Sequence, residues 1–228
     1  GVKASSISSM LGKLPLKCYN GHARVISKDT IPVYFVADSL KESSITSVFI
    51  SNLEHGGVQG SFSHDLGFYE SLILRLKMDK TSITDYKKVL QQSYPEEIQI
   101  DNVQIDSLKL LEEPVGVKFD LIFKPFGNED IVYFTPMLGA AIKRNPFISA
   151  ERFYPVEMPY TIDDIYVISM EIPKGYKVDE LPKSVRLNLN EDEGMFEYLI
   201  SGGKDNIQMR CRLLLKKATY LNKDYNSV

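Results

Sequence analysis

The chain has 228 residues, of which 43% are hydrophobic and 25% are charged, and its net charge is −3. This balance excludes an intrinsically disordered chain, which needs fewer large apolar residues and a stronger charge imbalance. Because acidic and basic residues are interspersed, the composition also argues against a nucleic-acid-binding protein with one basic face. No apolar run reaches the ~18 residues that a membrane-spanning helix needs, so we expect no membrane span.

Alternation of apolar and polar residues, the pattern of half-buried strands, recurs along the chain. The turn Glu54-His55-Gly56-Gly57 predicts a hairpin between a strand over 47–53 and a strand over 58–65. Three further strands are predicted. Alternating apolar residues indicate two of them, Val117, Phe119, Leu121 and Phe123 in one and Val185, Leu187 and Leu189 in the other. The third is the run 165–172, which ends at Pro173-Lys174-Gly175.

The clearest alternation lies between residues 206 and 217. One side carries the apolar residues Ile207, Met209, Cys211, Leu213 and Leu215; the other carries Gln208, Arg210, Arg212 and Lys216, with Leu214 as its only apolar residue. The turn 201–206 predicts a hairpin between this strand and one over 196–200. We interpret its basic residues, Arg210, Arg212, Lys216 and Lys217, as a solvated strand face.

Helical signals are few. Ser82, with Asp85 three residues later, is typical of a capped helix start and predicts a helix to about Gln92. A shorter helix is expected over 137–143, before Asn145-Pro146. We therefore predict a mainly β fold, an antiparallel β-sandwich of about ten or more strands with one or two short helices. One continuous sandwich is favoured over two small ones, with a possible sub-boundary at 143–149.

Two cysteines, Cys18 and Cys211, are too few for the disulfide framework of a small secreted protein. Whether they pair stays open, although the place of Cys211 on an apolar strand side favours a buried free thiol. Cys18, His55 and Asp65 or Asp79 follow the chain order of a transglutaminase-type triad. Because Cys18 does not open a helix and His55 falls in a glycine-containing turn, we predict no catalytic residue.

Metal and cofactor sites are not predicted either. The three histidines lack the spacing of zinc ligands. Asn188, Asn190 and Asp192 resemble the start of a calcium-binding loop, but Leu199 stands where the bidentate glutamate belongs. A plain acidic hairpin turn is the favoured interpretation of this segment.

Aromatic residues gather between positions 147 and 166. They are Phe147, Phe153, Tyr154, Tyr160 and Tyr166. Such residues can line a groove for a glycan or peptide, although in β proteins they more often belong to core and edge packing. Arg152 lies among them and is expected to need a fixed carboxylate partner, so a structural ion pair is favoured over a ligand contact.

Four segments of the C-terminal half resemble a known family. They are Asn145-Pro146-Phe147, Glu151-Arg152-Phe153-Tyr154-Pro155-Val156, Ile172-Pro173-Lys174-Gly175-Tyr176-Lys177-Val178 and Glu180-Leu181-Pro182-Lys183-Ser184. The family is the uncharacterised β-rich domain that follows the transglutaminase-like core in large envelope proteins of Gram-negative bacteria. More loosely, 14–21 resembles the segment that leaves the core, and 57–75 resembles the first hairpin of the C-terminal domain. Family members usually carry a tryptophan soon after the Asn-Gly segment, and this chain has none.

The resemblance implies a fragment of a larger polypeptide. Residues 1–40 would be a tag scar and the tail of the preceding transglutaminase-like domain, and 41–228 an accessory β-sandwich domain. The family's catalytic residues lie before the segment that Cys18 matches, so none can be carried over. The matched motif residues are expected to be structural; they are Asn145, Pro146, Phe147, Arg152, Tyr154, Pro155, Gly175, Tyr176, Leu181 and Pro182.

The function implied is that of a non-catalytic structural or interaction domain, C-terminal to a transglutaminase-like (cysteine protease-like) core. Its partners would be the upstream domains of the same polypeptide, in the periplasm, the cell envelope or a secreted protein. The alternative is a surface module that binds a glycan or a peptide. Neither a cofactor nor a nucleic-acid partner is expected.

Overall fold

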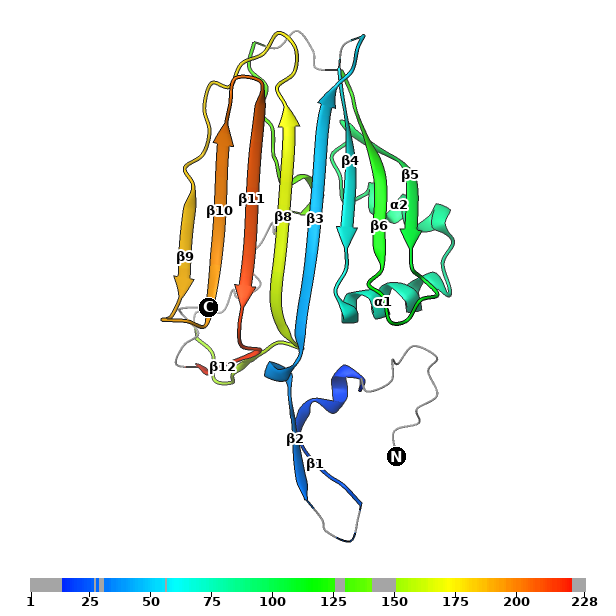
Figure 1. The fold of residues 1–228 in the computed structure, drawn as a ribbon, viewed down its shortest axis with the longest axis vertical. Helices are drawn as coiled ribbons and strands as arrows, with labels where there is room; N and C mark the ends of the chain where they lie inside the picture. Colours follow the sequence, from blue (N-terminus) through cyan, green and yellow to red (C-terminus); the bar gives the residue numbers. More distant parts are fainter. Residues whose placement is uncertain are drawn as a thin grey trace.

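An eight-stranded sheet forms the centre of the molecule in the computed structural model, which describes residues 14–26, 28, 31–55, 57–125, 130–140 and 151–222 (Figure 1). Its strands lie side by side in the order β5-β6-β4-β3-β8-β11-β10-β9. They are β3 (Lys41–Asn52), β4 (Val58–Asp65), β5 (Ile98–Asp106), β6 (Gly116–Phe123), β8 (Thr161–Glu171), β9 (Val185–Leu189), β10 (Gly194–Gly202) and β11 (Asn206–Leu215).

A single parallel pair divides this sheet into two antiparallel halves. β3 and β8 run parallel, with Lys41 opposite Thr161 at one end and Ile50 opposite Met170 at the other. Every other neighbouring pair of the sheet is antiparallel. The two strands that the sequence separates by more than a hundred residues therefore hold the two halves together.

Two small ribbons accompany the main sheet. β1 (Asn20–Arg24) pairs with β2 (Pro32–Val36) in a hairpin that extends away from the sheet, at the bottom of Figure 1. β7 (Val156–Glu157) pairs with β12 (Thr219–Tyr220). Three short 3-10 helices complete the described elements; they are η1 (Leu16–Cys18), η2 (Ala37–Ser39) and η3 (Leu138–Ala140).

Two α-helices cover one face of the β3–β6 half of the sheet (Figure 1). α2 (Ile83–Gln91) begins as predicted, because the Ser82 side chain caps it by accepting a 3.1 Å hydrogen bond from the Asp85 N–H. α1 (Phe68–Met78) follows Gly67, which has no side chain to cap it. The carboxylate of Glu42, on β3, takes that role and accepts a 2.9 Å hydrogen bond from the Glu70 N–H.

The core lies between these helices and the sheet. Along β3 every second residue from Glu42 to Ile50 is buried, because a strand points successive side chains to opposite faces. Large side chains of the covered face fill the space below the helices, among them Val48, Ile50, Phe62, Ile100, Phe119, Leu121, Tyr166, Ile168, Met170 and Met209. The rings of Phe62 and Phe119 stack at 4.3 Å between centroids.

The predicted fold class is confirmed, since the described chain is mainly β, mostly antiparallel and has two α-helices. The hairpins over 47–65 and 196–217 and the strand over 165–172 are present as β3–β4, β10–β11 and β8. The layering differs from two facing sheets of similar size, because both halves join in one sheet and α1 and α2 form a second layer over its β3–β6 half. Of the short helix expected over 137–143, the described part contains η3, and 141–143 lie outside the described residues.

Candidate functional site

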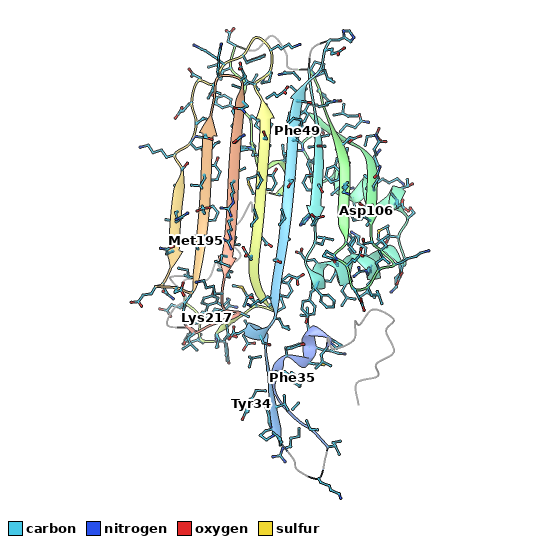
Figure 2. The ribbon with its side chains drawn as sticks, in the orientation of Figure 1. Tyr34, Phe35, Phe49, Asp106, Met195 and Lys217 are labelled. Atoms are coloured by element: carbon cyan, nitrogen blue, oxygen red, sulfur yellow. The ribbon has the colours of Figure 1, made fainter. Side chains whose placement is uncertain are left out.

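The sheet face opposite α1 and α2, which we call the open face, is the candidate site. Its central residues are Ser43, Ile45, Ser47 and Phe49 of β3, Asp163, Ile165, Val167 and Ser169 of β8, Gln208, Arg210, Arg212 and Leu214 of β11, and Met195, Glu197, Leu199 and Ser201 of β10. The strand register fixes this set, because paired residues of neighbouring strands point to the same face. Figure 2 labels Phe49 and Met195 on it.

Apolar side chains occupy the middle of the open face. Ile45 lies opposite Ile165 across the parallel pair, and Phe49 lies four residues farther along β3, on the same face. Phe49 is 50% exposed, Ile45 is 48% exposed and Val167 is 36% exposed. Ser61 of β4 and Ser169 of β8 lie opposite Phe49, whereas Arg210 and Arg212 of β11 lie opposite Val167 and Ile165. The centre of the open face is therefore a partly exposed apolar area with serines on one side and arginines on the other.

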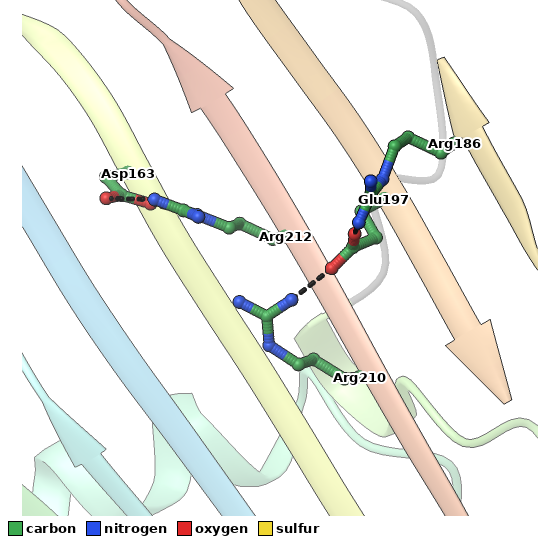
Figure 3. Close-up of polar contacts among 5 residues, drawn as sticks. All are labelled: Asp163, Arg186, Glu197, Arg210 and Arg212. Carbon is green, nitrogen blue, oxygen red and sulfur yellow. Dashed lines mark hydrogen bonds and ion pairs between the residues drawn. The ribbon is translucent and has the colours of Figure 1, made fainter. Parts of the chain in front are cut away.

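An ion-pair network lies directly beside this area (Figure 3). Glu197, on β10, is only 2% exposed and receives hydrogen bonds from two arginines, Arg186 of β9 and Arg210 of β11. The Arg186 Nε donates to Glu197 Oε2 over 2.8 Å. Arg212 forms a separate bidentate pair with Asp163 of β8, with N–O distances of 2.7 and 2.8 Å. Four strands are thus connected by side chains on this face.

The opposite charges of the network stabilise one another. The Arg186 guanidinium, with help from Arg210 and Arg212, holds the pKa of Glu197 below its usual value. The carboxylate of Asp163 raises the pKa of Arg212. Bidentate or shared carboxylates fix the direction of the planar guanidinium groups of all three arginines. Since the Arg186 side chain remains 62% exposed, it can still contact another surface.

Sequence reasoning missed Glu197 and Asp163, and it interpreted the basic residues of β11 as a solvated face. In the structure each of them is paired, Arg210 and Arg212 as above, Lys216 with Asp192 and Lys217 with Glu193. The sequence of the predicted hairpin could have indicated that Glu197 pairs with an arginine. Counting outward from the predicted turn 201–206 pairs Ile200 with Ile207 and places Glu197 opposite Arg210, which it binds, whereas the observed register pairs Glu197 with Arg212.

The catalytic triad that was set aside is not assembled. His55 lies in the turn after β3, whereas Cys18 belongs to η1, near the opposite end of that strand (Figure 1). β3 has twelve residues, and a strand of this length spans about 40 Å. Cys18 and Cys211 are both free, and burial raises the pKa of the Cys211 thiol. The free thiol agrees with the prediction for Cys211, but the side chain is half-buried rather than buried.

The motif residues of the C-terminal half lie at several places. Gly175 has φ +90° and ends a turn in which the Tyr176 N–H donates to the Pro173 carbonyl. This turn lines a cavity of about 500 Å³ together with Asn52, Glu171 and residues 204–206. A Cβ on Gly202 would meet Leu181 at 2.8 Å, so 178–182 pack closely on the β10–β11 turn. Asn145, Pro146 and Phe147 lie outside the described residues.

The aromatic cluster is split. Phe153 and Tyr154 are 82% and 79% exposed, and Arg152 beside them is exposed as well. Tyr166 is buried and donates a 2.9 Å hydrogen bond to the Pro136 carbonyl, and Tyr160 stacks on Tyr69. The inner rings therefore belong to the packing, and the outer two are free to meet a ligand.

Within the described ranges, no three His, Cys, Asp or Glu residues are placed so that they could hold a metal ion. No helix in the described part of the chain is long and apolar enough to cross a membrane.

The C-terminal half, with β7 to β12, matches one family. Residues 130–228 match the family model of DUF3858, described as a domain of unknown function with a solved structure. The matched range contains β8 and the strands beyond it, whereas β3 to β6 lie outside the range. No curated protein and no solved structure matches the chain. The open face thus extends across the boundary of the DUF3858 match, with its apolar centre on both sides.

Proposed function

We propose that residues 41–228 act as a non-catalytic structural or interaction domain, which packs through the open face against another folded domain of the same polypeptide. The observation that carries this proposal is the apolar centre of the face, Ile45, Phe49, Ile165 and Val167, which stays partly exposed on the two central strands. Contiguous apolar side chains in a polar frame are typical of surfaces that another protein covers.

The ion-pair network suits the rim of such an interface. Arginines are enriched at interfaces because a planar guanidinium can bind a carboxylate and stack on an aromatic ring. Here Glu197 and Asp163 hold Arg210 and Arg212 in place before any partner arrives. A side chain that is already ordered loses less conformational entropy on binding, so this arrangement favours association.

The occupant that we propose is a transglutaminase-like core that precedes this domain, in a periplasmic, cell-envelope or secreted protein. Support comes from the resemblance of 145–184 to the domain that follows such cores; the match of 130–228 to DUF3858 identifies a domain of unknown function over the same range. The β1–β2 ribbon leads directly through η2 into β3, the strand at the centre of the open face. A preceding domain would therefore enter next to the surface that it is proposed to cover.

Phe49→Asp tests the proposal in the complete protein encoded by the gene. Phe49 still exposes half of its surface, about 100 Å², and covering that area would contribute about 2.5 kcal/mol to docking. The Asp variant should leave the melting temperature of the 228-residue chain unchanged within about 2 °C, yet separate the two domains in limited proteolysis. Ile73→Asp, at a 58% exposed position of α1, is the matched control and should leave docking intact. Equal behaviour of the two variants in the complete protein would refute the proposal.

A second candidate function is favoured by the exposure of Phe153 and Tyr154. We propose as the alternative that these two rings bind a glycan or peptide, since exposed aromatic side chains stack on sugars and apolar peptide groups. Alanine at both positions should then abolish binding to immobilised glycans or peptides without lowering the melting temperature. If the complete protein binds such ligands equally well with both rings removed, the alternative is wrong.

A further inference from the structure

Three carboxyl groups meet under α1, on the covered side of the sheet. Glu42 comes from β3, Asp164 from β8 and Glu70 from the first turn of α1. Glu42 is 3% exposed. Its Oε1 accepts the Glu70 N–H, while Asp164 Oδ1 accepts a 2.8 Å hydrogen bond from the Ser44 hydroxyl. We call Glu42, Glu70 and Asp164 the acidic cluster.

The fit around Glu42 leaves little room for rearrangement. A Cβ on Gly67 would lie 2.3 Å from Glu42 Oε1, so only glycine permits the carboxylate to reach the start of α1. Backbone N–H groups of Phe68, Tyr69 and Glu70 stabilise one side of this carboxylate. Its other oxygen, Oε2, is buried and has no hydrogen-bond partner among the described residues.

Two more buried polar atoms of the same region, Glu70 Oε2 and His64 Nε2, lack a hydrogen-bond partner within the described chain. The Tyr69 hydroxyl, by contrast, has Tyr19 as its hydrogen-bonding neighbour. An unsatisfied buried polar atom costs about 1–3 kcal/mol, so these two atoms and Glu42 Oε2 favour a species that bonds them. A proton is the simplest species, since a protonated carboxyl group can donate a hydrogen bond to a neighbouring oxygen.

The charges around the acidic cluster favour proton uptake. Burial is the main cause that raises the pKa of all three carboxyl groups, and Asp164 raises the pKa of Glu42 and Glu70 further. Burial lowers the pKa of His64, and this imidazole offsets part of the rise in the pKa of Asp164. The other titratable groups near the acidic cluster are Tyr19, Tyr69 and Tyr160, while Asp65 and Asp163 lie on the opposite, open face of the sheet. None of the described lysines or arginines forms an ion pair with the cluster.

We propose that Glu42, Glu70 and Asp164 form a proton-binding site that keeps at least one of them protonated at pH values where an exposed glutamate is ionised. The shared proton holds the start of α1 on β3 and β8. Release of the proton leaves like charges together in a buried place and weakens this contact. Tyr19, next to the β1–β2 ribbon, lies against Tyr69 of α1. Weakening the contact between α1 and the sheet would therefore also weaken the contact between the ribbon and the rest of the molecule.

The sign of the pH effect follows from linkage. Above the ordinary pKa of 4.5 the unfolded chain has released these protons, whereas the folded chain still holds one. The contribution to stability is therefore fully present below that pH and is lost as the pH rises through the folded pKa. For each proton held only by the folded state, the unfolding constant rises tenfold per pH unit within this window.

The test compares urea unfolding of the whole chain between pH 4.5 and pH 8 with that of Glu70→Gln. The substituted side chain has no proton to release at this position. The unfolding constant of the variant should therefore rise less steeply with pH than that of the wild type, and the two rises should differ by up to tenfold per pH unit. Asp101→Asn, which removes a surface carboxylate paired with Lys87, is the matched control and should keep the wild-type pH slope over this range. Identical slopes for wild type and Glu70→Gln would overturn the proposal.

A second measurement does not depend on any variant. Carbon-13 NMR of the carboxyl groups in the wild-type chain should show at least one of the three titrating well above pH 4.5. Normal titration of all three would contradict the proposal. So would saturable shifts of these signals on addition of Ca²⁺ or Zn²⁺ at constant pH, because they would identify a metal ion as the missing species.

Discussion

Gly67→Ala examines the contact between Glu42 and α1. The backbone at Gly67 has φ −66°, which alanine adopts without strain. In the absence of other effects, this substitution would stabilise the protein by about 0.4–1 kcal/mol through the unfolded state. The new methyl group would, however, lie 2.3 Å from Glu42 Oε1 and 2.4 Å from its Cδ, so the carboxylate has to move.

Moving the carboxylate removes the cap of α1, which is worth about 0.5–2 kcal/mol, and crowding adds about 1–3 kcal/mol. After subtraction of the entropic gain, the free energy of unfolding should fall by about 0.5–4.6 kcal/mol. With a slope near 2 kcal/mol per molar urea, the midpoint drops by about 0.3–2.3 M. Circular dichroism in urea at pH 7 measures this shift.

Gly116→Ala is the control, because its Cβ would meet its nearest neighbour, Asp65 Oδ1, at an ordinary 3.4 Å. This variant should stay within about 0.5 kcal/mol of the wild type. If Gly67→Ala is as stable as Gly116→Ala, the carboxylate of Glu42 does not hold the start of α1, and the reasoning is refuted.

Three further predictions concern the core, a loop anchor and the open face. Leu121→Ala, at a fully buried position, should cost about 2–5 kcal/mol in urea unfolding, against less than about 1 kcal/mol for Leu199→Ala at a 40% exposed position. Arg75 donates hydrogen bonds to four carbonyl groups between 107 and 113, so Arg75→Ala should cost at least about 1–3 kcal/mol and speed proteolysis there; unchanged cleavage would contradict this. The depressed pKa of Glu197 contributes stability above pH 4.5 that is lost as pH falls through the folded pKa. Glu197→Gln should therefore reduce the fall in the free energy of unfolding as the pH drops below 4.5. An equal fall in the variant and the wild type would contradict a stabilising role of the ion-pair network.

Local patterns predicted much of this fold because the forces involved are local. The alternation over 206–217 reflects one strand with a buried side, and Ser82 caps α2 through a neighbour three residues away. α1 was not predicted, since its cap, Glu42, comes from a strand about thirty residues earlier. The parallel pairing of β3 with β8 was equally out of reach, because no turn connects the two strands and their register depends on the whole sheet.

The candidate site was likewise predicted only where its contacts are local in the sequence. The basic side of β11 was recognised, but its partners were not, since Asp163 lies on a strand that only the tertiary fold brings alongside. Ile45 and Phe49 fall on the exposed side of a strand whose buried side carries Glu42, Ser44 and Thr46. Because each side of β3 mixes polar and apolar residues, with Val48 and Ile50 also on the buried side, hydropathy along β3 gave no indication of which side is covered.

Protection of the open face in the complete protein tests the central claim most directly. A cysteine at Ser47, an exposed position in the middle of the face, would be placed in a background with both native cysteines changed to serine, and Thr84 on α2 would serve as the control site. Docking of a preceding domain predicts that the maleimide reaction at position 47 is at least tenfold slower in the complete protein than in the 228-residue chain, with position 84 unaffected. Equal rates at position 47 in both proteins would contradict the claim.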